Sequence, residues 1–469
     1  MKKLNELIDC KYDTCIYGIK TDSREVKKGD LFVAIKGYFV DHSEYIDDAI
    51  KNGASAVITD TNYEGNIPII KVDDIEKTLE LVCKKFFGYE DDIKLFGITG
   101  TDGKTTTATI LSEVLDNFEN TAYIGTNGIK YNDISKNINN TTPKIEKIYE
   151  YLNYLKERKC QNCVLEVSSE ALLHKRVDSL KFKYAIYTNI TEDHLNIHKT
   201  VENYINSKKK LTTLLDDGGI IISNMDDLNQ GSIRNNNSHL IYTYGMDNAS
   251  DFLIKNIKEI DDRTYFDIVI NDEVYSIKSP YLGKYNVYNL TAAFVVCYLE
   301  HFNLEQVINS IENLKPIPGR GEIFTSSTKC KIILDYAHTF NAIKNLVEQQ
   351  KKYNQKIIVV TGAAGGREKE KRNLIGEYLL ENCDLVIFTM DDPRYENVDD
   401  IIDDMIKTSE KTNYLRIIDR SKAIEKAISI AKENDRVLVI GKGRDNYMAI
   451  ENRYENYSDY EVIKKYILD

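Results

Sequence analysis

The residues with the clearest chemical signature are GITGTDGKTTTA at positions 97–108. An apolar, β-branched run at 94–99 leads into this segment, and residues 105–114 continue with a helical pattern. A glycine-lined turn from a strand into a helix N-terminus gathers backbone N–H groups and the positive end of the helix dipole, which favours phosphate. Lys104 adds a cation for the β- and γ-phosphates, and Thr105 a hydroxyl for Mg²⁺. We therefore interpret this segment as the phosphate loop of a nucleotide-binding protein.

The match to the generic phosphate-loop expression is incomplete. That expression has a glycine five residues before the Gly-Lys pair, and here the position is Ile98. The interpretation therefore depends on the strand–turn–helix context, and a purely structural glycine-rich turn is the alternative.

Composition narrows the class of protein. The chain has 469 residues, 42 % of them hydrophobic and 29 % charged, which is typical of a globular protein of about three domains. A net charge of −12 argues against nonspecific nucleic-acid binding. We find no apolar run of the roughly 18 residues that a membrane span needs and no signal-peptide pattern at the N-terminus, so we expect a cytoplasmic protein without membrane partners. Cys160 and Cys163 have no second cysteine pair, and we interpret them as incidental thiols.

The chain divides into three predicted α/β domains, at 1–88, 89–315 and 316–469. The first has short apolar runs and a helical stretch at 75–87. In the second, alternating strands and helices predict a mostly parallel sheet with helices on both faces, and 252–277 has the alternation of an antiparallel addition. The expected strands of these two domains are 31–35, 56–58, 96–99, 164–167, 185–189 and 219–223.

The segment 315–320, with two prolines and a glycine, is the clearest linker. Beyond it a second α/β pattern begins, with strands at 331–334, 357–361, 385–389 and 437–440 and helices at 341–353, 371–381, 398–407 and 422–432. Two open α/β sheets joined by a linker predict a ligand cleft between them.

Charged residues follow several of these strands. Glu166 and His194 come after neighbouring strands of the central domain and could both bind Mg²⁺, although a surface carboxylate and a structural histidine are the alternatives. Lys208 stands in a run of three lysines, which by itself indicates a solvated charge run. Four polar loops follow strands of the third domain, and together they predict a charged site that faces the nucleotide-binding central domain. These loops are 335–338, 362–367, 391–394 and 441–445.

Together these segments resemble the Mur ligases, specifically the UDP-N-acetylmuramoyl-tripeptide synthetases (MurE type), over essentially the whole chain. Residues 22–34 and the pair Asp41-His42 look like the UDP-binding segment of that type. This segment separates the type from folylpolyglutamate synthetases, which share the ATP loop and lack this module. The resemblance implies a small N-terminal UDP-binding module, a central P-loop ATPase-like domain with a parallel sheet, and a Rossmann-like C-terminal domain for the amino acid.

The resemblance also implies roles for individual residues. Nucleotide contacts fall on Gly100, Thr101, Asp102, Gly103, Lys104, Thr105, Thr106, Asn286, Asn289, Arg320, Asp335 and His338. Contacts to the acceptor substrate fall on Ser23, Thr141, Thr142, Ser169 and Arg176, and those to the amino acid on Asp391, Asp392, Arg394, Gly441 and Asp445. The implied ligands of two Mg²⁺ ions are Thr105, Glu166, His194 and Lys208, the last as a carbamate. The implied catalytic residues are Lys104, Glu166, His194 and Lys208.

The implied reaction is ATP-dependent amide formation through an acyl phosphate, which adds a diamino acid to UDP-MurNAc-L-Ala-D-Glu during peptidoglycan precursor synthesis. We expect small-molecule substrates, a monomer, and meso-diaminopimelate as the added residue, with L-lysine next. A related ligase with another acidic acceptor and a non-catalytic nucleotide-dependent binding protein are the alternatives.

The chain departs from the family pattern mainly around the predicted amino-acid pocket. Family members that add diaminopimelate usually have Asn at the position of Asp392, and His-Glu at the positions of Arg444 and Asp445, whereas Arg394 is retained. The altered spacing also admits lysine, ornithine or another diamine. Elsewhere Glu170 and His174 stand where His and Gln are common, and Phe340-Asn341 where Pro-Asp is usual.

Overall fold

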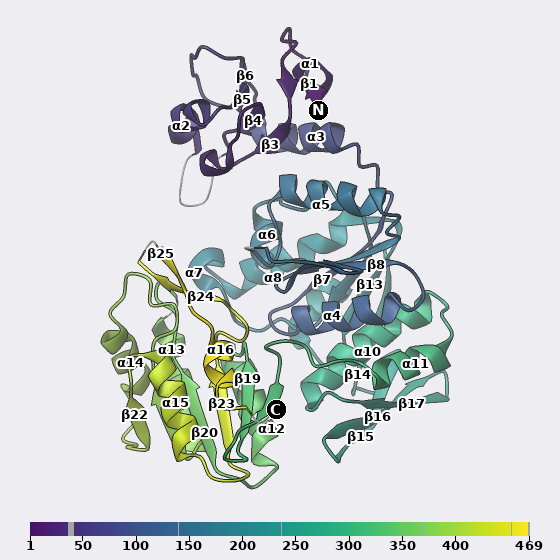
Figure 1. Ribbon diagram of the computed structural model, residues 1–469. Helices are drawn as coiled ribbons and strands as arrows, with labels where there is room; N and C mark the ends of the chain where they lie inside the picture. Colours follow the sequence, from purple (N-terminus) through teal and green to yellow (C-terminus); the bar gives the residue numbers. More distant parts are fainter. Residues whose placement is uncertain (36–41, 139, 236, 368, 452, 468–469) are drawn as a thin grey trace.

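The computed structural model describes residues 1–35, 42–138, 140–235, 237–367, 369–451 and 453–467. The fold consists of three α/β units, each a sheet with its helices, which are called layers below. The N-terminal layer lies at the top of Figure 1 and the C-terminal layer at the lower left. Among the described residues, no helix combines the length and apolar character that crossing a membrane requires.

The N-terminal layer is a four-stranded parallel sheet in the order β3-β4-β5-β6. Helix α3 (Ile75–Phe87) has the bounds that the sequence predicts, because the Asp74 side chain caps its first turn and Gly88 ends it at φ +65°. Asp41 lies outside the described residues. The other elements are β1 (Lys2–Lys3), α1 (Leu4–Leu7), β2 (Cys15–Ile16), β3 (Gly18–Lys20), β4 (Asp30–Val33), α2 (Ile46–Lys51), β5 (Ala56–Thr59) and β6 (Ile69–Lys71).

The central layer is an eleven-stranded sheet in the order β10-β9-β8-β11-β7-β12-β13-β14-β15-β16-β17. Its strands are β7 (Lys94–Thr99), β8 (Thr121–Gly125), β9 (Gly128–Tyr131), β10 (Ile134–Lys136), β11 (Asn162–Glu166), β12 (Phe182–Tyr187), β13 (Leu215–Asn224), β14 (Leu240–Gly245), β15 (Phe252–Ile260), β16 (Arg263–Ile270) and β17 (Glu273–Ser279). The strands from β8 to β15 in this order run parallel, and the strands at both edges run antiparallel. Both the parallel sheet and the antiparallel addition that the sequence predicts are therefore confirmed.

Helices cover both faces of the central sheet (Figure 1). Along β7, Leu95 packs into the core on one face, whereas Phe96 and Ile98 pack into the core on the other, as strand alternation requires. One face carries α4 (Lys104–Leu115), α10 (Lys284–Leu299) and α11 (Leu304–Glu312); the other carries α5 (Ile145–Glu157), α6 (Ser169–Leu173) and α8 (Val201–Lys209). The shorter α7 (Leu195–His198) and α9 (Gly231–Arg234) follow β12 and β13.

The C-terminal layer is a six-stranded sheet in the order β18-β19-β23-β20-β21-β22, parallel except for β18. Its strands are β18 (Glu322–Thr325), β19 (Lys331–Asp335), β20 (Ile357–Thr361), β21 (Leu385–Phe388), β22 (Tyr414–Arg416) and β23 (Arg436–Ile440), and a hairpin of β24 (Tyr447–Ile450) and β25 (Arg453–Asn456) follows. Helices α12 (Phe340–Lys351), α13 (Lys369–Asn382) and α14 (Val398–Ile406) pack into one core, and α15 (Arg420–Ile430) and α16 (Asp459–Lys464) into the other.

A fully buried ion pair connects the last helix to this sheet. Arg420 Nε and Nη2 donate to the Asp459 carboxylate at 2.8 and 2.7 Å, and Nη2 also donates to the Ile440 carbonyl at 2.8 Å. We expect Asp459→Ala to lower the free energy of unfolding of this layer by about 3–5 kcal/mol, because it leaves a buried guanidinium uncompensated. Urea unfolding measures the loss.

The matched control is Asp13→Ala, which removes the exposed partner of Lys3. Its urea midpoint is expected to equal that of the wild type, because exposed ion pairs contribute little. Equal midpoints for both variants would show that the buried pair does not stabilise the layer.

Candidate active site

The phosphate loop lies at the centre of the molecule. Strand β7 ends at Thr99, the loop follows, and α4 begins at Lys104, which confirms the predicted strand–turn–helix. Gly103 caps the helix at φ +83°, and a Cβ there would lie 2.6 Å from Asn289 Oδ1, so the position requires glycine. Because β11 and β12 flank β7 in parallel, the residues that follow all three strands meet at this edge.

The Lys104 ammonium group lies inside the loop. Its Nζ donates to the carbonyl oxygens of Gly100, at 3.0 Å, and Thr101, at 2.8 Å. Burial lowers the pKa of Lys104, while the nearby Glu166 and Asp102 carboxylates oppose that shift. An ammonium group has three donors, so one of them is left for a phosphate oxygen.

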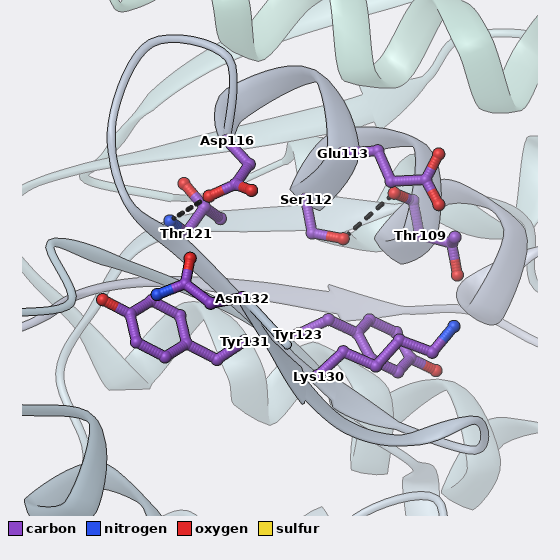
Figure 2. Close-up of a pocket in the computed structure, with 9 residues that line it drawn as sticks. All are labelled: Thr109, Ser112, Glu113, Asp116, Thr121, Tyr123, Lys130, Tyr131 and Asn132. Carbon is purple, nitrogen blue, oxygen red and sulfur yellow. Dashed lines mark hydrogen bonds between the residues drawn. The ribbon is translucent and has the colours of Figure 1, made fainter. Parts of the chain in front are cut away.

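Glu166, at the end of β11, is fully buried and accepts several hydrogen bonds. Thr105 Oγ1 donates to its Oε2 at 2.9 Å, and the Thr126 N–H and the Tyr123 hydroxyl donate to its Oε1. Figure 2 shows the Tyr123 ring beside the Lys130 side chain, in a small pocket of about 110 Å³ behind the site. Neither Tyr123 nor Thr126 belongs to a sequence motif, and nothing in the sequence pointed to them.

The pair of Glu166 and Thr105 fits a magnesium ion. Neighbouring ligands of an octahedral Mg²⁺ with bonds of about 2.05 Å lie about 2.9 Å apart. The distance between Glu166 Oε2 and Thr105 Oγ1 is 2.9 Å, and both donors are oxygens. Among the described residues, no three His, Cys, Asp or Glu side chains group together as a metal site. Water and phosphate would therefore supply most of the coordination, as Mg²⁺ prefers.

His194, before α7, lies near two carboxylates and one guanidinium. Its ring nitrogens are 3.3 Å from Asp193 Oδ2 and 3.7 Å from Glu170 Oε1, and Arg367 Nη1 lies 3.4 Å from its Nδ1. Burial lowers the pKa of His194 to about 3; the positive charges of Arg367, Lys104 and Lys208 act in the same direction, and Asp193 opposes them. The imidazole is therefore neutral at neutral pH, which is the form that binds metal.

Lys208 is buried, with 1 % of its surface exposed, so the interpretation of the lysine run as solvated is wrong for this residue. Its Nζ donates to the Gly100 carbonyl oxygen at 2.6 Å and lies 4.6 Å from the centre of the Tyr204 ring. Burial, together with the charge of Lys104, lowers the pKa of Lys208 well below its usual value. Lys210, two residues on, instead pairs with Asp178.

A cavity of about 820 Å³ lies between the central and C-terminal layers, a volume typical of a ligand site. Its lining includes eight residues that the resemblance assigns to the nucleotide: Asp102, Gly103, Thr106, Asn286, Asn289, Arg320, Asp335 and His338. Tyr288 and the exposed Leu228 also line the cavity, although neither was predicted as a site residue. The predicted cleft between the two sheets is therefore present.

The C-terminal layer contacts the phosphate loop directly. Arg320 Nη2 donates to Thr105 Oγ1 at 3.0 Å, and Thr339 Oγ1 lies 3.1 Å from both carboxylate oxygens of Asp102. Backbone N–H groups of Gly321 and Ala337 donate to the Asp335 carboxylate. The structure thus brings linker, phosphate loop and C-terminal sheet edge together.

The residues assigned to the acceptor substrate form two groups. Thr142 Oγ1 donates to the backbone carbonyl oxygen of Glu166 at 2.7 Å, and Arg176 Nη1 donates to the Thr142 carbonyl at 3.1 Å. Thr141 Oγ1 lies 3.0 Å from Thr126 Oγ1, and Ser169 Oγ lies 3.1 Å from His198 Nε2. These residues therefore adjoin Glu166, whereas Ser23 lies in the N-terminal layer.

Two of the residues assigned to the amino acid, Asp392 and Asp445, flank a buried lysine. Lys442 Nζ lies 2.8 Å from Asp392 Oδ1 and 3.5 Å from Asp445 Oδ2. A Cβ at Gly441 would lie 2.2 Å from Asp391 Oδ2, so these two residues are in close contact. Arg394 Nη1 donates to the Gly365 carbonyl at 3.1 Å.

Arg444, where the family usually has histidine, makes contacts outside this group. Its Nε donates to Glu322 Oε2 at 2.8 Å, and its guanidinium carbon lies 3.3 Å from the centre of the Tyr460 ring. Its charge is therefore satisfied by Glu322.

Comparisons with known proteins agree with this geometry. The models of the Mur ligase family catalytic domain, the Mur ligase middle domain and the Mur ligase glutamate ligase domain match residues 15–84, 98–297 and 319–443. A UDP-N-acetylmuramoyl-L-alanyl-D-glutamate–2,6-diaminopimelate ligase from Clostridioides difficile (strain 630) is 36 % identical over 95 % of this chain and 94 % of its own length. The protein of the same name from Bacillus cereus is 32 % identical, over 99 % of this chain and 98 % of its own.

Solved structures show the same fold. A structure of a UDP-N-acetylmuramoyl-L-alanyl-D-glutamate–2,6-diaminopimelate ligase superimposes with a TM-score of 0.68 and 26 % identity, covering 99 % of this chain and 98 % of that one. The Mycobacterium tuberculosis folylpolyglutamate synthase, at 13 % identity, shares the fold over 76 % of this chain and 91 % of its own, with a TM-score of 0.61. The chain therefore belongs to the Mur ligase family and is an ATP-dependent ligase.

Proposed function

We propose that this ligase adds meso-diaminopimelate to UDP-MurNAc-L-Ala-D-Glu during peptidoglycan precursor synthesis. The observation that carries the proposal is the position of Thr105, whose hydroxyl contacts both Glu166 of the central layer and Arg320 of the linker. Through this contact the glycine-rich loop and the Glu166 carboxylate, which we propose as a Mg²⁺ ligand, meet the C-terminal layer. The diaminopimelate ligases named above support the choice of substrates.

The three domains would divide the substrates among them. We assign residues 1–88 to the UDP-sugar, 89–315 to ATP and 316–469 to the amino acid. We propose a monomer that acts in the cytoplasm on small molecules, without nucleic-acid or membrane partners.

The mechanism follows from the proposed substrates and the residues at the loop. An oxygen of the acceptor carboxylate attacks the γ-phosphorus of ATP, the bond to ADP breaks, and an acyl phosphate forms. The α-amine of the amino acid then attacks the acyl carbon, inorganic phosphate leaves, and the amine loses a proton. Lys104 and Arg320 supply positive charge where the phosphoryl group is transferred, and the phosphate loop orients that phosphoryl group.

Glu166, Thr105 and His194 would hold the Mg²⁺ ions, which when bound neutralise charge on the phosphoryl oxygens. Lys208 suits carbamylation, because its burial favours the neutral form of the amine, which is the form that reacts with CO₂. The product is a carboxylate-like group that could serve as a further oxygen ligand beside the loop.

We assign the distal end of the diamino acid to the group around Lys442. Arg394 would bind the distal carboxylate, and Asp445 would bind the distal ammonium group. Since Arg444 is paired with Glu322, its bulk does not by itself exclude diaminopimelate.

Phosphate release from ATP with UDP-MurNAc-L-Ala-D-Glu tests the proposal, with meso-diaminopimelate, L-lysine, L-ornithine or no amino acid. We expect release to favour diaminopimelate, and Arg394→Ala to raise its KM about 30-fold, as loss of a well-placed anchor of about 2 kcal/mol would. The control is Arg453→Ala, on the exposed strand β25, which should keep the wild-type KM.

A preference for lysine or ornithine would contradict the assignment of the substrate. An unchanged KM in Arg394→Ala would contradict the role of that residue. No release with any amine would contradict the proposed function itself.

A further inference from the structure

The Tyr336 ring lies between the linker and the loop that carries Asp445. Its backbone N–H donates to the Gly319 carbonyl at 3.0 Å. A Cβ at Gly319 would lie 2.7 Å from the ring, and a Cβ at Gly443 would lie 2.4 Å from it. Both glycines have positive φ, +70° and +50°. The backbone conformation and the close contact with the ring therefore both favour glycine at these positions. Two separate segments thus leave room for one aromatic ring.

One end of this arrangement reaches the phosphate loop. The Arg320 guanidinium carbon lies 4.5 Å from the centre of the Tyr336 ring, within the range of a cation–π contact. The same guanidinium donates to Thr105, which in turn donates to Glu166. The ring therefore supports the arginine that touches the loop.

The other end reaches the proposed amino-acid pocket. The contact of the ring with Gly443 brings Tyr336 next to Asp445, two residues farther on. Burial raises the pKa of Tyr336, and the neighbouring Asp445 carboxylate raises it further. Asp445 also faces Lys442 at 3.5 Å. A second contact joins the same two segments, because Glu322 accepts from both Arg444 and the Gly319 N–H.

We propose that Tyr336 is a positioning residue that couples the two sites, so that a diamino acid bound at Asp445 tightens nucleotide binding at Thr105, and the reverse. The inference rests on the proposed function, since it needs an amino acid at Asp445. The physical route is a continuous series of contacts, from Asp445 through the Tyr336 ring and Arg320 to Thr105. By linkage, each ligand then changes the affinity of the other by the same factor.

A role in packing alone makes a different prediction. If the ring only filled space, loss of its hydroxyl would leave both affinities and their coupling unchanged, because Tyr336→Phe keeps the ring and its contacts with Gly319, Gly443 and Arg320. The hydroxyl matters only if its contact with Asp445 transmits the state of the pocket.

The test measures the Kd of the non-hydrolysable analogue AMPPCP with Mg²⁺ by calorimetry, with and without the diamino acid that supports phosphate release. In the wild type we expect the amino acid to tighten binding at least about fivefold. In Tyr336→Phe the factor by which the amino acid tightens AMPPCP binding should fall to less than twofold, while the Kd of AMPPCP without amino acid changes less than threefold. Tyr184→Phe is the matched control. It removes a partly buried hydroxyl that donates to Glu300 at 2.7 Å, and it should keep the wild-type coupling factor.

Gly443→Ala is a second variant, which displaces the ring and leaves its hydroxyl intact. It should also lose the coupling, and it replaces Tyr336→Phe if that variant does not fold. A wild-type coupling factor in either folded variant overturns the proposal, and so does a wild type that forms product without any coupling. A wild type that forms no amide refutes the proposed function instead, so the two failures are distinguishable.

Discussion

Lys104→Ala is expected to remove detectable amide formation, a loss of at least about 10²–10³ in rate. In the structure the ammonium group lies within the loop, bonded to the carbonyl oxygens of Gly100 and Thr101, with one donor left for phosphate. Alanine removes that donor and the positive charge at the site where the phosphoryl group is transferred. Product formation, followed by chromatography of the UDP-linked peptide, measures the loss.

The control for this experiment is Lys94→Ala, at the opposite end of the same strand. Lys94 pairs with Glu300, far from the loop, and its loss should leave turnover close to that of the wild type. Thermal unfolding of both variants should match the wild type, since α4 keeps its other contacts. Turnover near the wild-type rate in Lys104→Ala would show that this segment is not the phosphate loop of the reaction.

The sequence predicts the parts of the fold that local chemistry controls. Helix α3 has the predicted bounds because Asp74 and Gly88 are local start and stop signals. The first residues of β12 were missed because the polar Lys183 interrupts its apolar run. Short edge strands such as β10 and β22 were missed because a run of three residues is too short to show an alternating pattern and gains strand geometry only from its neighbour.

The candidate site shows the same contrast between features that local sequence controls and features that depend on distant segments. The positions of Glu166, His194 and Asp335 at the edges of their sheets could be predicted, because parallel strands bring the residues at their carboxyl ends to one edge of a sheet. The burial of Lys208 could not be read from the sequence, because it depends on the backbone of Gly100, 108 residues away. Tyr123 had no sequence signal of its own, because its contact with Glu166 joins distant segments. Tyr336 lies in the predicted loop 335–338, but its contact with Arg320 could not be read from the sequence.

Lys208→Ala is expected to lose amide formation nearly as completely as Lys104→Ala, and to recover part of it in the presence of a short-chain carboxylate such as acetate. The buried amine, whose pKa is lowered by burial, lies 2.6 Å from the Gly100 carbonyl oxygen, in contact with the phosphate loop. If its function is to carry a carbamate, an added carboxylate can enter the space that alanine leaves and supply the same oxygen ligand. Phosphate release as a function of acetate concentration measures the recovery.

The matched control is Lys209→Ala, the next residue of the same lysine run on α8. It removes another lysine from the same helix and leaves Lys208 in place, so activity should stay near the wild-type level and acetate should have no effect. Full activity in Lys208→Ala would return this lysine to a structural role. A loss that no carboxylate recovers, with Lys209→Ala unaffected, would mean that the amine itself is required, and the carbamate assignment would be wrong.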